Sequence, residues 1–258
     1  MQPQHGGSAF DWIRHSRTEL QDSEDAGWAG NFVSHLMPPG FEAYAKVFHR
    51  IEASYENIDN PLTQSEISVL KIPSCQELKS LVESRRAQGS RIRWREVGEV
   101  LNVPFAPAIS HDWYRKKLVE GCWPRFLRGP DEGLLHPEEC RGLVAVLQTF
   151  TDSGRCFFRF AETPFVGTNK PLLFHGALDE LGEFMKSGDY QFSPEYWWPP
   201  NQAWCVCSDY DLMFTVVGGS RSLISALLNS DVLECLEVTP QTRIDSLAPM
   251  PEPHSHRR

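Results

Sequence analysis

Two acidic residues, Asp209 and Asp211, stand between two apolar runs in the carboxyl-terminal part of the chain. Two carboxylates at a hairpin tip can bind a hard cation, or act as an acid and a base if burial separates their pKa values. The competing interpretation is structural, because aspartate in a turn commonly hydrogen-bonds to the nearby backbone. We favour the structural interpretation and keep the pair as a candidate ligand site.

A second candidate is the junction of Gly218, Gly219, Ser220 and Arg221, where a predicted strand passes into a predicted helix. Backbone N–H groups at a helix start favour an anion, and the serine hydroxyl and arginine can add a donor and charge. The segment lacks the nucleotide-binding and hydrolase glycine patterns, so we expect no cofactor. A serine cap beside tightly packed glycines is the favoured alternative.

Aromatic side chains supply a third candidate. Tyr196, Trp197 and Trp198 precede a proline pair, and Trp204 follows it. Tryptophan dominates the energetics of many protein interfaces, whereas a buried tryptophan is a core residue. We expect Trp204 to be buried. Neighbours in an extended segment point to opposite sides, so we expect one member of the 197–198 pair to be exposed and to contact a partner.

Cys205 and Cys207 are two residues apart in a predicted strand and therefore share a face, where two thiolates can bind one metal ion. A structural zinc ion usually takes four ligands, and His175 is the one nearby candidate histidine. We expect both cysteines to pack in the core, and we expect no metal site.

Composition describes an ordinary globular protein, with 258 residues, 41% of them hydrophobic and 23% charged. No apolar run approaches the roughly 20 residues of a membrane helix, and we see no secretory signal. The seven cysteines are an odd number without a disulfide pattern. We therefore expect a cytoplasmic protein with reduced thiols and no membrane contact.

The formal net charge of −9 disfavours nucleic acid as a ligand, because nucleic-acid binders need a basic surface. An acidic chain is compatible with a basic protein partner, since opposite fields speed association. Solubility also accounts for the charge and is the simpler explanation.

Hydrophobic periodicity predicts an α+β fold with a mixed or mainly antiparallel sheet and packed helices. An antiparallel hairpin is predicted around Asp209–Asp211. Strands are predicted at 41–51, 155–161, 170–178, 203–208, 212–219 and 233–240. A helix remains the alternative for 41–51. Helices are predicted at 75–86, 91–102, 136–150, 179–188 and 221–230.

The chain divides into a flexible N-terminal arm at 1–27, a single α+β domain at 28–246 and a disordered tail at 247–258. Residues 52–90 are polar, contain turn residues and carry a helix of their own, and we interpret them as an insertion.

The run SPEYWWPPNQAWCVCSDYDLMFTVVGGSRSLISALL, residues 193–228, combines these candidates. It resembles a C-terminal block of uncharacterised bacterial proteins that are common in actinobacteria. PPGFEAYAKVFHRI at 38–51 and RWREVGEVL at 93–101 resemble the N-terminal block of the same proteins. The chain departs from that pattern at 52–90 and at Cys207. The resemblance implies one domain spanning both blocks and assigns no catalytic residues; a looser likeness is to bacterial immunity proteins.

No catalytic triad, Cys/His pair or paired glutamates can be assembled from spacing, and an enzyme is therefore the less favoured class. We expect an immunity or accessory protein that associates stoichiometrically with a basic protein partner. The alternative is a small-ligand-binding protein or an enzyme that uses Asp209, Asp211 and the helix start at Gly218–Ser220.

Overall fold

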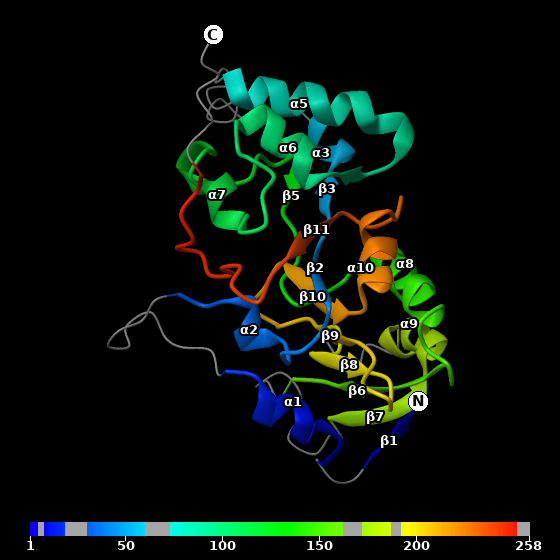
Figure 1. Ribbon diagram of the computed structural model, residues 1–258. Coiled ribbons are helices and arrows are strands. Elements are labelled where there is room, and N and C mark those ends of the chain that lie inside the picture. The colour runs from blue at the N-terminus through cyan, green and yellow to red at the C-terminus, as the bar shows by residue number, and fades with distance from the viewer. Residues whose placement is uncertain (5–7, 19–29, 60–72, 162–171, 187–191, 252–258) are drawn as a thin grey trace. The chain divides into compact units, whose positions relative to one another are not determined.

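Contacts within the computed structural model group into two compact units (Figure 1). Unit 1 comprises Met1–His49 and Asp131–Arg243, and unit 2 comprises Arg50–Pro130 and Ile244–Arg258. The expected insertion at 52–90 falls inside unit 2, which continues to Pro130. We expected a single domain over 28–246. The structure describes residues 1–4, 8–18, 30–59, 73–161, 172–186 and 192–251.

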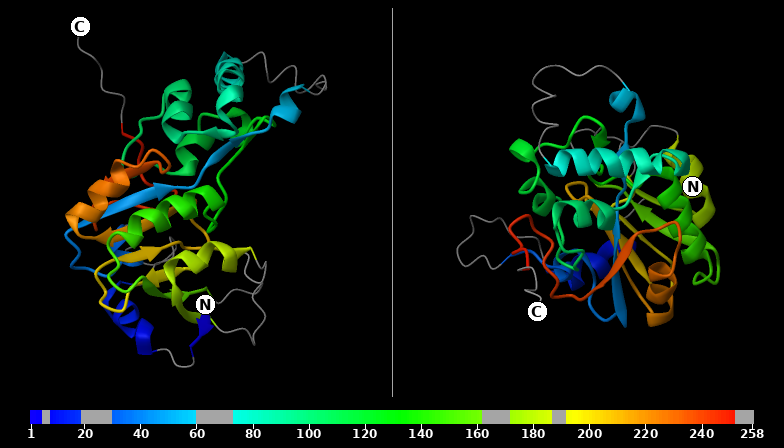
Figure 2. Two further views of the ribbon diagram at one scale, coloured as in Figure 1. Left: turned by 90° about the vertical axis from the view of Figure 1, so that its right-hand side faces the viewer. Right: turned by 90° about the horizontal axis from the view of Figure 1, so that it is seen from above.

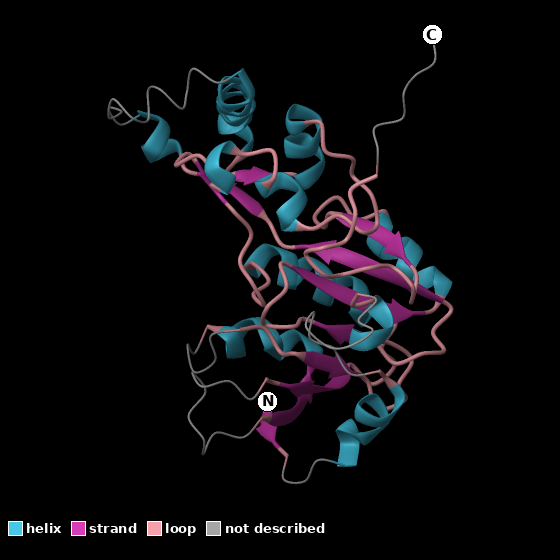
Figure 3. Cartoon of the chain, turned by 90° about the vertical axis from the view of Figure 1, so that its left-hand side faces the viewer, coloured by secondary structure: helices cyan, strands magenta, loops and turns pink. Residues whose placement is uncertain are grey.

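Unit 1 is built on an eight-stranded sheet with the order β1-β7-β6-β8-β9-β10-β2-β11, in which every pairing is antiparallel (Figures 1 and 3). The predicted α+β class with a mainly antiparallel sheet is confirmed. The strands are β1 (Gln2–Pro3), β2 (Ala43–Phe48), β6 (Arg155–Arg159), β7 (Leu173–Ala177), β8 (Tyr196–Trp198), β9 (Cys205–Cys207), β10 (Phe214–Gly219) and β11 (Cys235–Val238).

Helices cover both faces of this sheet (Figures 1 and 2). α8, α9 and α10 lie on one face, and η1, α1 and α2 lie on the other. These helices are η1 (Ser8–Phe10), α1 (Asp11–Ser16), α2 (Val33–Leu36), α8 (Pro137–Gln148), η4 (Leu178–Glu180), α9 (Leu181–Met185) and α10 (Arg221–Leu228).

The first face carries the main apolar core. Trp197 and Trp204 lie here in a T-shaped pair, with ring centroids 6.5 Å apart. The Trp204 indole N–H donates to the Thr151 hydroxyl at 3.1 Å, so its one polar atom is satisfied. From α8, Leu143 and Leu147 face this core at helical spacing, as the sequence predicts.

The second face is covered by the N-terminal segment. Phe10 lies 5.2 Å from the Tyr196 ring and 5.9 Å from the Trp198 ring, measured between centroids. The Tyr196 hydroxyl donates to the Leu36 carbonyl at 2.8 Å. Within the expected N-terminal arm, residues 8–16 form η1 and α1, and β1 pairs with β7.

Unit 2 contains a three-stranded antiparallel sheet with the order β4-β3-β5, beside helices. Its core includes Trp94, Trp113 and Tyr114, and the Tyr114 hydroxyl donates to the Trp94 carbonyl at 2.8 Å. Its elements are β3 (Ile51–Ala53), α3 (Tyr55–Asp59), α5 (Pro73–Arg85), η2 (Arg86–Gln88), β4 (Arg91–Ile92), α6 (Trp94–Leu101), α7 (His111–Arg115), η3 (Val119–Gly121) and β5 (Leu127–Arg128).

The structure describes residues 247–251 of the expected tail. Ala248 is buried, and its carbonyl accepts a hydrogen bond from the Trp113 indole at 2.9 Å. Residues 252–258 of the expected tail, and 5–7 and 19–27 of the expected arm, lie outside the described residues.

Local predictions hold for most of the sheet. The segment that the sequence left open between strand and helix is strand β2, and the predicted hairpin is β9 with β10. The aromatic run is different, because Tyr196–Trp198 is missing from the predicted strands and forms strand β8, paired with β6 and β9. None of the helices in the described part has the length and hydropathy of a membrane span.

A buried hydrogen-bonded chain crosses the end of the sheet. His49 donates from Nδ1 to the Asp131 carbonyl at 2.7 Å, so its Nε2 is the acceptor for the Thr215 hydroxyl at 3.0 Å. Thr215 in turn accepts from the Ser208 hydroxyl at 2.7 Å. Burial lowers the pKa of His49 to about 4, which keeps the ring neutral and able to accept.

Acidification from pH 7 to pH 4 should destabilise the protein through His49. Its pKa is about 4 when folded and 6.5 ordinarily, so the unfolded chain takes up the proton first and is favoured as the pH falls. The effect is about 3 kcal/mol, at about 1.4 kcal/mol per pKa unit. Denaturant unfolding should show His49→Gln less stable than wild type at pH 7, with a difference that narrows toward pH 4. A pH-independent difference would contradict this role.

Candidate functional site

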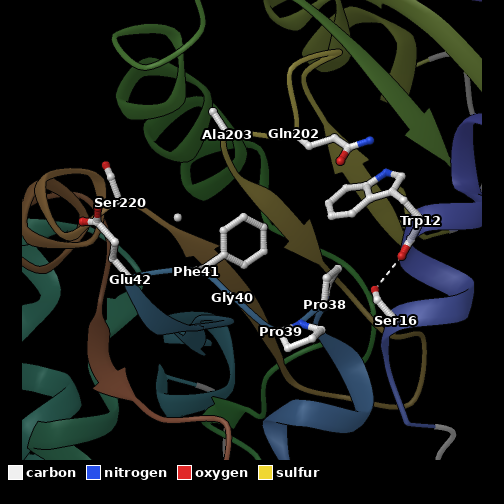
Figure 4. Close-up of a pocket in the computed structure, with 11 residues that line it drawn as sticks. Trp12, Ser16, Pro38, Pro39, Gly40, Phe41, Glu42, Gln202, Ala203 and Ser220 are labelled. Atoms are coloured by element: carbon white, nitrogen blue, oxygen red, sulfur yellow. Dashed lines mark hydrogen bonds between the residues drawn. The ribbon is translucent and has the colours of Figure 1, made fainter.

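A pocket of about 430 Å³ lies in unit 1, where four segments meet (Figure 4). Its wall is formed by Trp12 and Ser16 of α1, by residues 38–42, by residues 202–203 and by residues 219–220. Figure 4 shows the Phe41 ring in the middle, with Glu42 and Ser220 at one end and Trp12 at the other. The lining therefore has a carboxylate and a hydroxyl at one end, and the Trp12 ring beside Gln202 and Ser16 at the other.

The turn at 38–42 places Phe41 on the end of the sheet. The Tyr44 hydroxyl donates to the Pro38 carbonyl at 3.2 Å and so holds the turn against β2. Gly40 has φ +97°, a left-handed conformation that favours glycine. The rings of Phe41 and Tyr44 meet edge to face, with centroids 5.9 Å apart. The result is a half-buried aromatic ring beside a proline pair.

Two glycines let this ring and α10 approach the sheet. A Cβ atom on Gly218 would lie 2.5 Å from Cδ2 of Phe41, and one on Gly219 would lie 2.6 Å from Cδ2 of Leu223. Real Cβ atoms do not approach other atoms so closely, so a side chain at position 218 would displace the Phe41 ring and one at 219 would displace the end of the Leu223 side chain. The alternative of tight glycine packing, which we favoured from the sequence, describes this junction.

The helix start that we considered as an anion site already holds a carboxylate of the same chain. Glu42 accepts the Arg221 backbone N–H through Oε2 at 2.9 Å, and the Ser220 hydroxyl accepts the Leu223 N–H at 3.2 Å. The Arg221 guanidinium contacts the Glu42 carbonyl at 3.2 Å and Glu237 at 3.3 Å. Glu42 and Ser220 therefore already accept the Arg221 and Leu223 N–H groups of this helix start.

The opposite wall is a second Pro-Pro turn. Gln202 N–H donates to the Pro199 carbonyl at 2.9 Å, and the Asn201 side chain accepts from the Ala203 N–H at 3.2 Å. Gln202 has φ +56°, a left-handed conformation that is uncommon for a residue with a side chain. The turn leaves Gln202 and Ala203 exposed on the pocket wall.

Trp12 closes the aromatic end of the pocket. The Ser16 hydroxyl donates to the Trp12 carbonyl within α1, as Figure 4 marks. The Trp12 indole meets the Trp198 ring edge to face, with centroids 6.4 Å apart, and stays half-buried. Trp198 thus supports the pocket from below its surface.

The acidic hairpin lies at the opposite end of the sheet from this pocket. Asp209 lies before Phe214, the first residue of β10, whereas Gly219 is the last residue of that strand. An extended strand from Phe214 to Gly219 is about 17 Å long. The Asp209 carboxylate accepts the Asp211 N–H at 3.0 Å, which is the turn interaction that we favoured. Burial raises the pKa of Asp209. A site that combines the hairpin with the helix start at Gly218–Ser220 is therefore not assembled.

The predicted exposed tryptophan is wrong. Tyr196, Trp197 and Trp198 are all at most 1% exposed, so none of them forms a surface contact for a partner. Trp197 and Trp198 do point to opposite faces of β8, but both faces are covered, by α8–α10 and by the N-terminal segment.

Cys205 and Cys207 pack in the sheet, and burial raises the pKa of each thiol. His175 lies on β7, three strands away and about 14 Å distant at the usual strand spacing, so it cannot share a metal with them. Among the described residues, no three metal-ligating side chains come together.

Sequence reasoning missed the pocket. It did not connect Trp12 and residues 38–42 with Gln202 and Ala203. Two Pro-Pro turns in a short chain are the available signal, since each turn exposes the residues that follow it. Comparisons with models of protein families, with curated proteins and with solved structures found no match.

The Gly218→Ala variant should be less stable than wild type by about 2 kcal/mol, because the new methyl group displaces the Phe41 ring. Gly182→Ala is the matched control, since a Cβ atom there meets nothing within 4 Å. Denaturant unfolding of both variants checks this. Equal stability of Gly218→Ala and wild type would show that Phe41 does not depend on the glycine.

Proposed function

We propose that this protein acts by stoichiometric association with a basic protein partner, as an immunity or accessory protein, and that the pocket around Phe41 is a contact surface. The observation that carries the proposal is the half-buried pair Phe41 and Trp12, which line an open pocket. Aromatic side chains in pockets are the usual anchors of protein interfaces. They replace Trp197 and Trp198, whose burial removes them from that role.

Charge supports the same class of partner. The chain carries a formal net charge of −9, which favours encounter with a basic protein. The two blocks by which the sequence resembles uncharacterised bacterial proteins both reach the pocket. Residues 38–42 come from the first block, and 202–203 with 219–220 come from the second.

On this proposal the protein works in the cytoplasm. All seven cysteines lie in the described part of the chain and are unpaired with one another. Thiols in this state suit a reducing compartment.

A second candidate function is binding of a small molecule. A different pocket of about 440 Å³ lies in unit 1 between α8 and α9, with Leu134, Leu135, Cys140 and Met185 among its lining residues. Its size and apolar side chains fall within the usual range of ligand sites. The small-molecule alternative therefore rests on this pocket and no longer on the hairpin of Asp209 and Asp211.

Ala203→Arg should weaken the partner complex by at least about tenfold, or about 1.4 kcal/mol, because a long cationic side chain fills the pocket. Ala203 is exposed, so folding should be unaffected. Ala145→Arg on α8 is the control, since it adds the same charge at an exposed position that does not line the pocket. The measurement is affinity capture from the native cells, followed by calorimetry with the purified partner.

Two outcomes would contradict the proposal. A purified partner that binds wild type and Ala203→Arg with equal Kd would exclude the pocket as the contact. If no protein binds in near-equal amount, association with a protein is not the function, and the pocket between α8 and α9 becomes the site to screen with ligands.

A further inference from the structure

The pocket around Phe41 has one charge in its lining. Of the described residues that line it, Glu42 is the one with an acidic or basic side chain, and the others are aromatic, proline, small or uncharged polar residues. The hydrogen bond from the Arg221 backbone uses Oε2 of Glu42 and holds the carboxylate at the rim. A pocket with one carboxylate beside aromatic rings suits a cation on an apolar stem.

Two arginines of this chain contact both an aromatic ring and a carboxylate. In unit 2, the Arg86 guanidinium lies 4.8 Å from the Tyr55 ring centroid and contacts Asp59 at 2.7 and 2.9 Å. A guanidinium plane can stack on a ring while its N–H groups reach a carboxylate, and an ammonium cannot stack in this way.

Unit 1 contains a second example. The Arg159 guanidinium lies 4.4 Å from the Phe10 ring centroid and forms an ion pair with Glu195. Two units of one chain therefore combine an aromatic ring and a carboxylate around an arginine. The lining of the pocket also contains an aromatic ring and a carboxylate, those of Phe41 and Glu42.

We propose that the pocket binds an arginine side chain from an extended segment of the protein partner. The aliphatic stem lies between Trp12 and Phe41, and the guanidinium pairs with Glu42. This inference rests on the proposed function, because it names the group of the partner that enters the site. It also accounts for the choice of a basic partner, since the pocket selects one positive side chain.

The test uses the Trp12 indole N–H as a reporter in proton–nitrogen correlation spectra, with its signal assigned from its loss in Trp12→Phe. The probes are three capped pentapeptides, Gly-Ser-Xaa-Ser-Gly, in which Xaa is arginine, citrulline or lysine. Citrulline keeps the shape of arginine and removes its charge. We expect a saturable shift with the arginine peptide, binding at least about tenfold weaker with citrulline, and intermediate binding with lysine.

Matched variants test the carboxylate. Glu42→Gln should reduce binding of the arginine peptide to the citrulline level. Glu237→Gln should bind like wild type, although it removes the same charge from another contact of Arg221. Citrulline binding equal to arginine, lysine binding equal to arginine, or arginine binding unchanged in Glu42→Gln would each overturn the inference.

The outcome separates this inference from the proposed function. If the arginine peptide fails to shift the signal while Ala203→Arg still weakens the partner complex, the pocket is a contact for another kind of side chain. If the peptide binds as expected and no protein partner is found, the arginine site stands and stoichiometric association does not.

Discussion

Burial of both faces of the eight-stranded sheet is the constraint on which the rest of unit 1 depends. Trp197 and Trp198 are neighbours on β8, and each fills a different side. The sheet also buries polar strand residues. Lys46 is buried with its ammonium 4.0 Å from the Phe214 ring centroid, and burial lowers its pKa to about 7. His49 remains neutral within its hydrogen-bonded chain.

Because both faces of the unit 1 sheet are covered, a site on this sheet can form only at the ends of its strands. β2 begins, β8 ends and β10 ends at the same end of the sheet, because their neighbours are antiparallel. The two Pro-Pro turns and the start of α10 therefore meet there and form the pocket. The acidic hairpin joins β9 to β10 at the other end, so the two candidate sites of the sequence are separated by the length of a strand.

The start of α10 contributes to the pocket in a way that differs from anion binding. Its N–H groups favour negative charge, and the chain supplies that charge itself through Glu42. The helix thus holds a carboxylate at the rim and turns an expected anion site into an acidic one. Gly218 and Gly219 also help to form the pocket, because they let Phe41 and α10 lie directly against the sheet.

Local patterns in the sequence predicted the α+β class, the β9–β10 hairpin and the turn role of Asp209, because alternation, helical spacing and turn residues act over a few positions. Only the tertiary structure decided that Trp198 is buried, since the covering residues Phe10 and Trp12 lie far away in the chain. It also decided the pocket. Residues 12, 42, 203 and 220 lie in four separate segments of the sequence. Long-range strand pairing and helix docking bring these segments together.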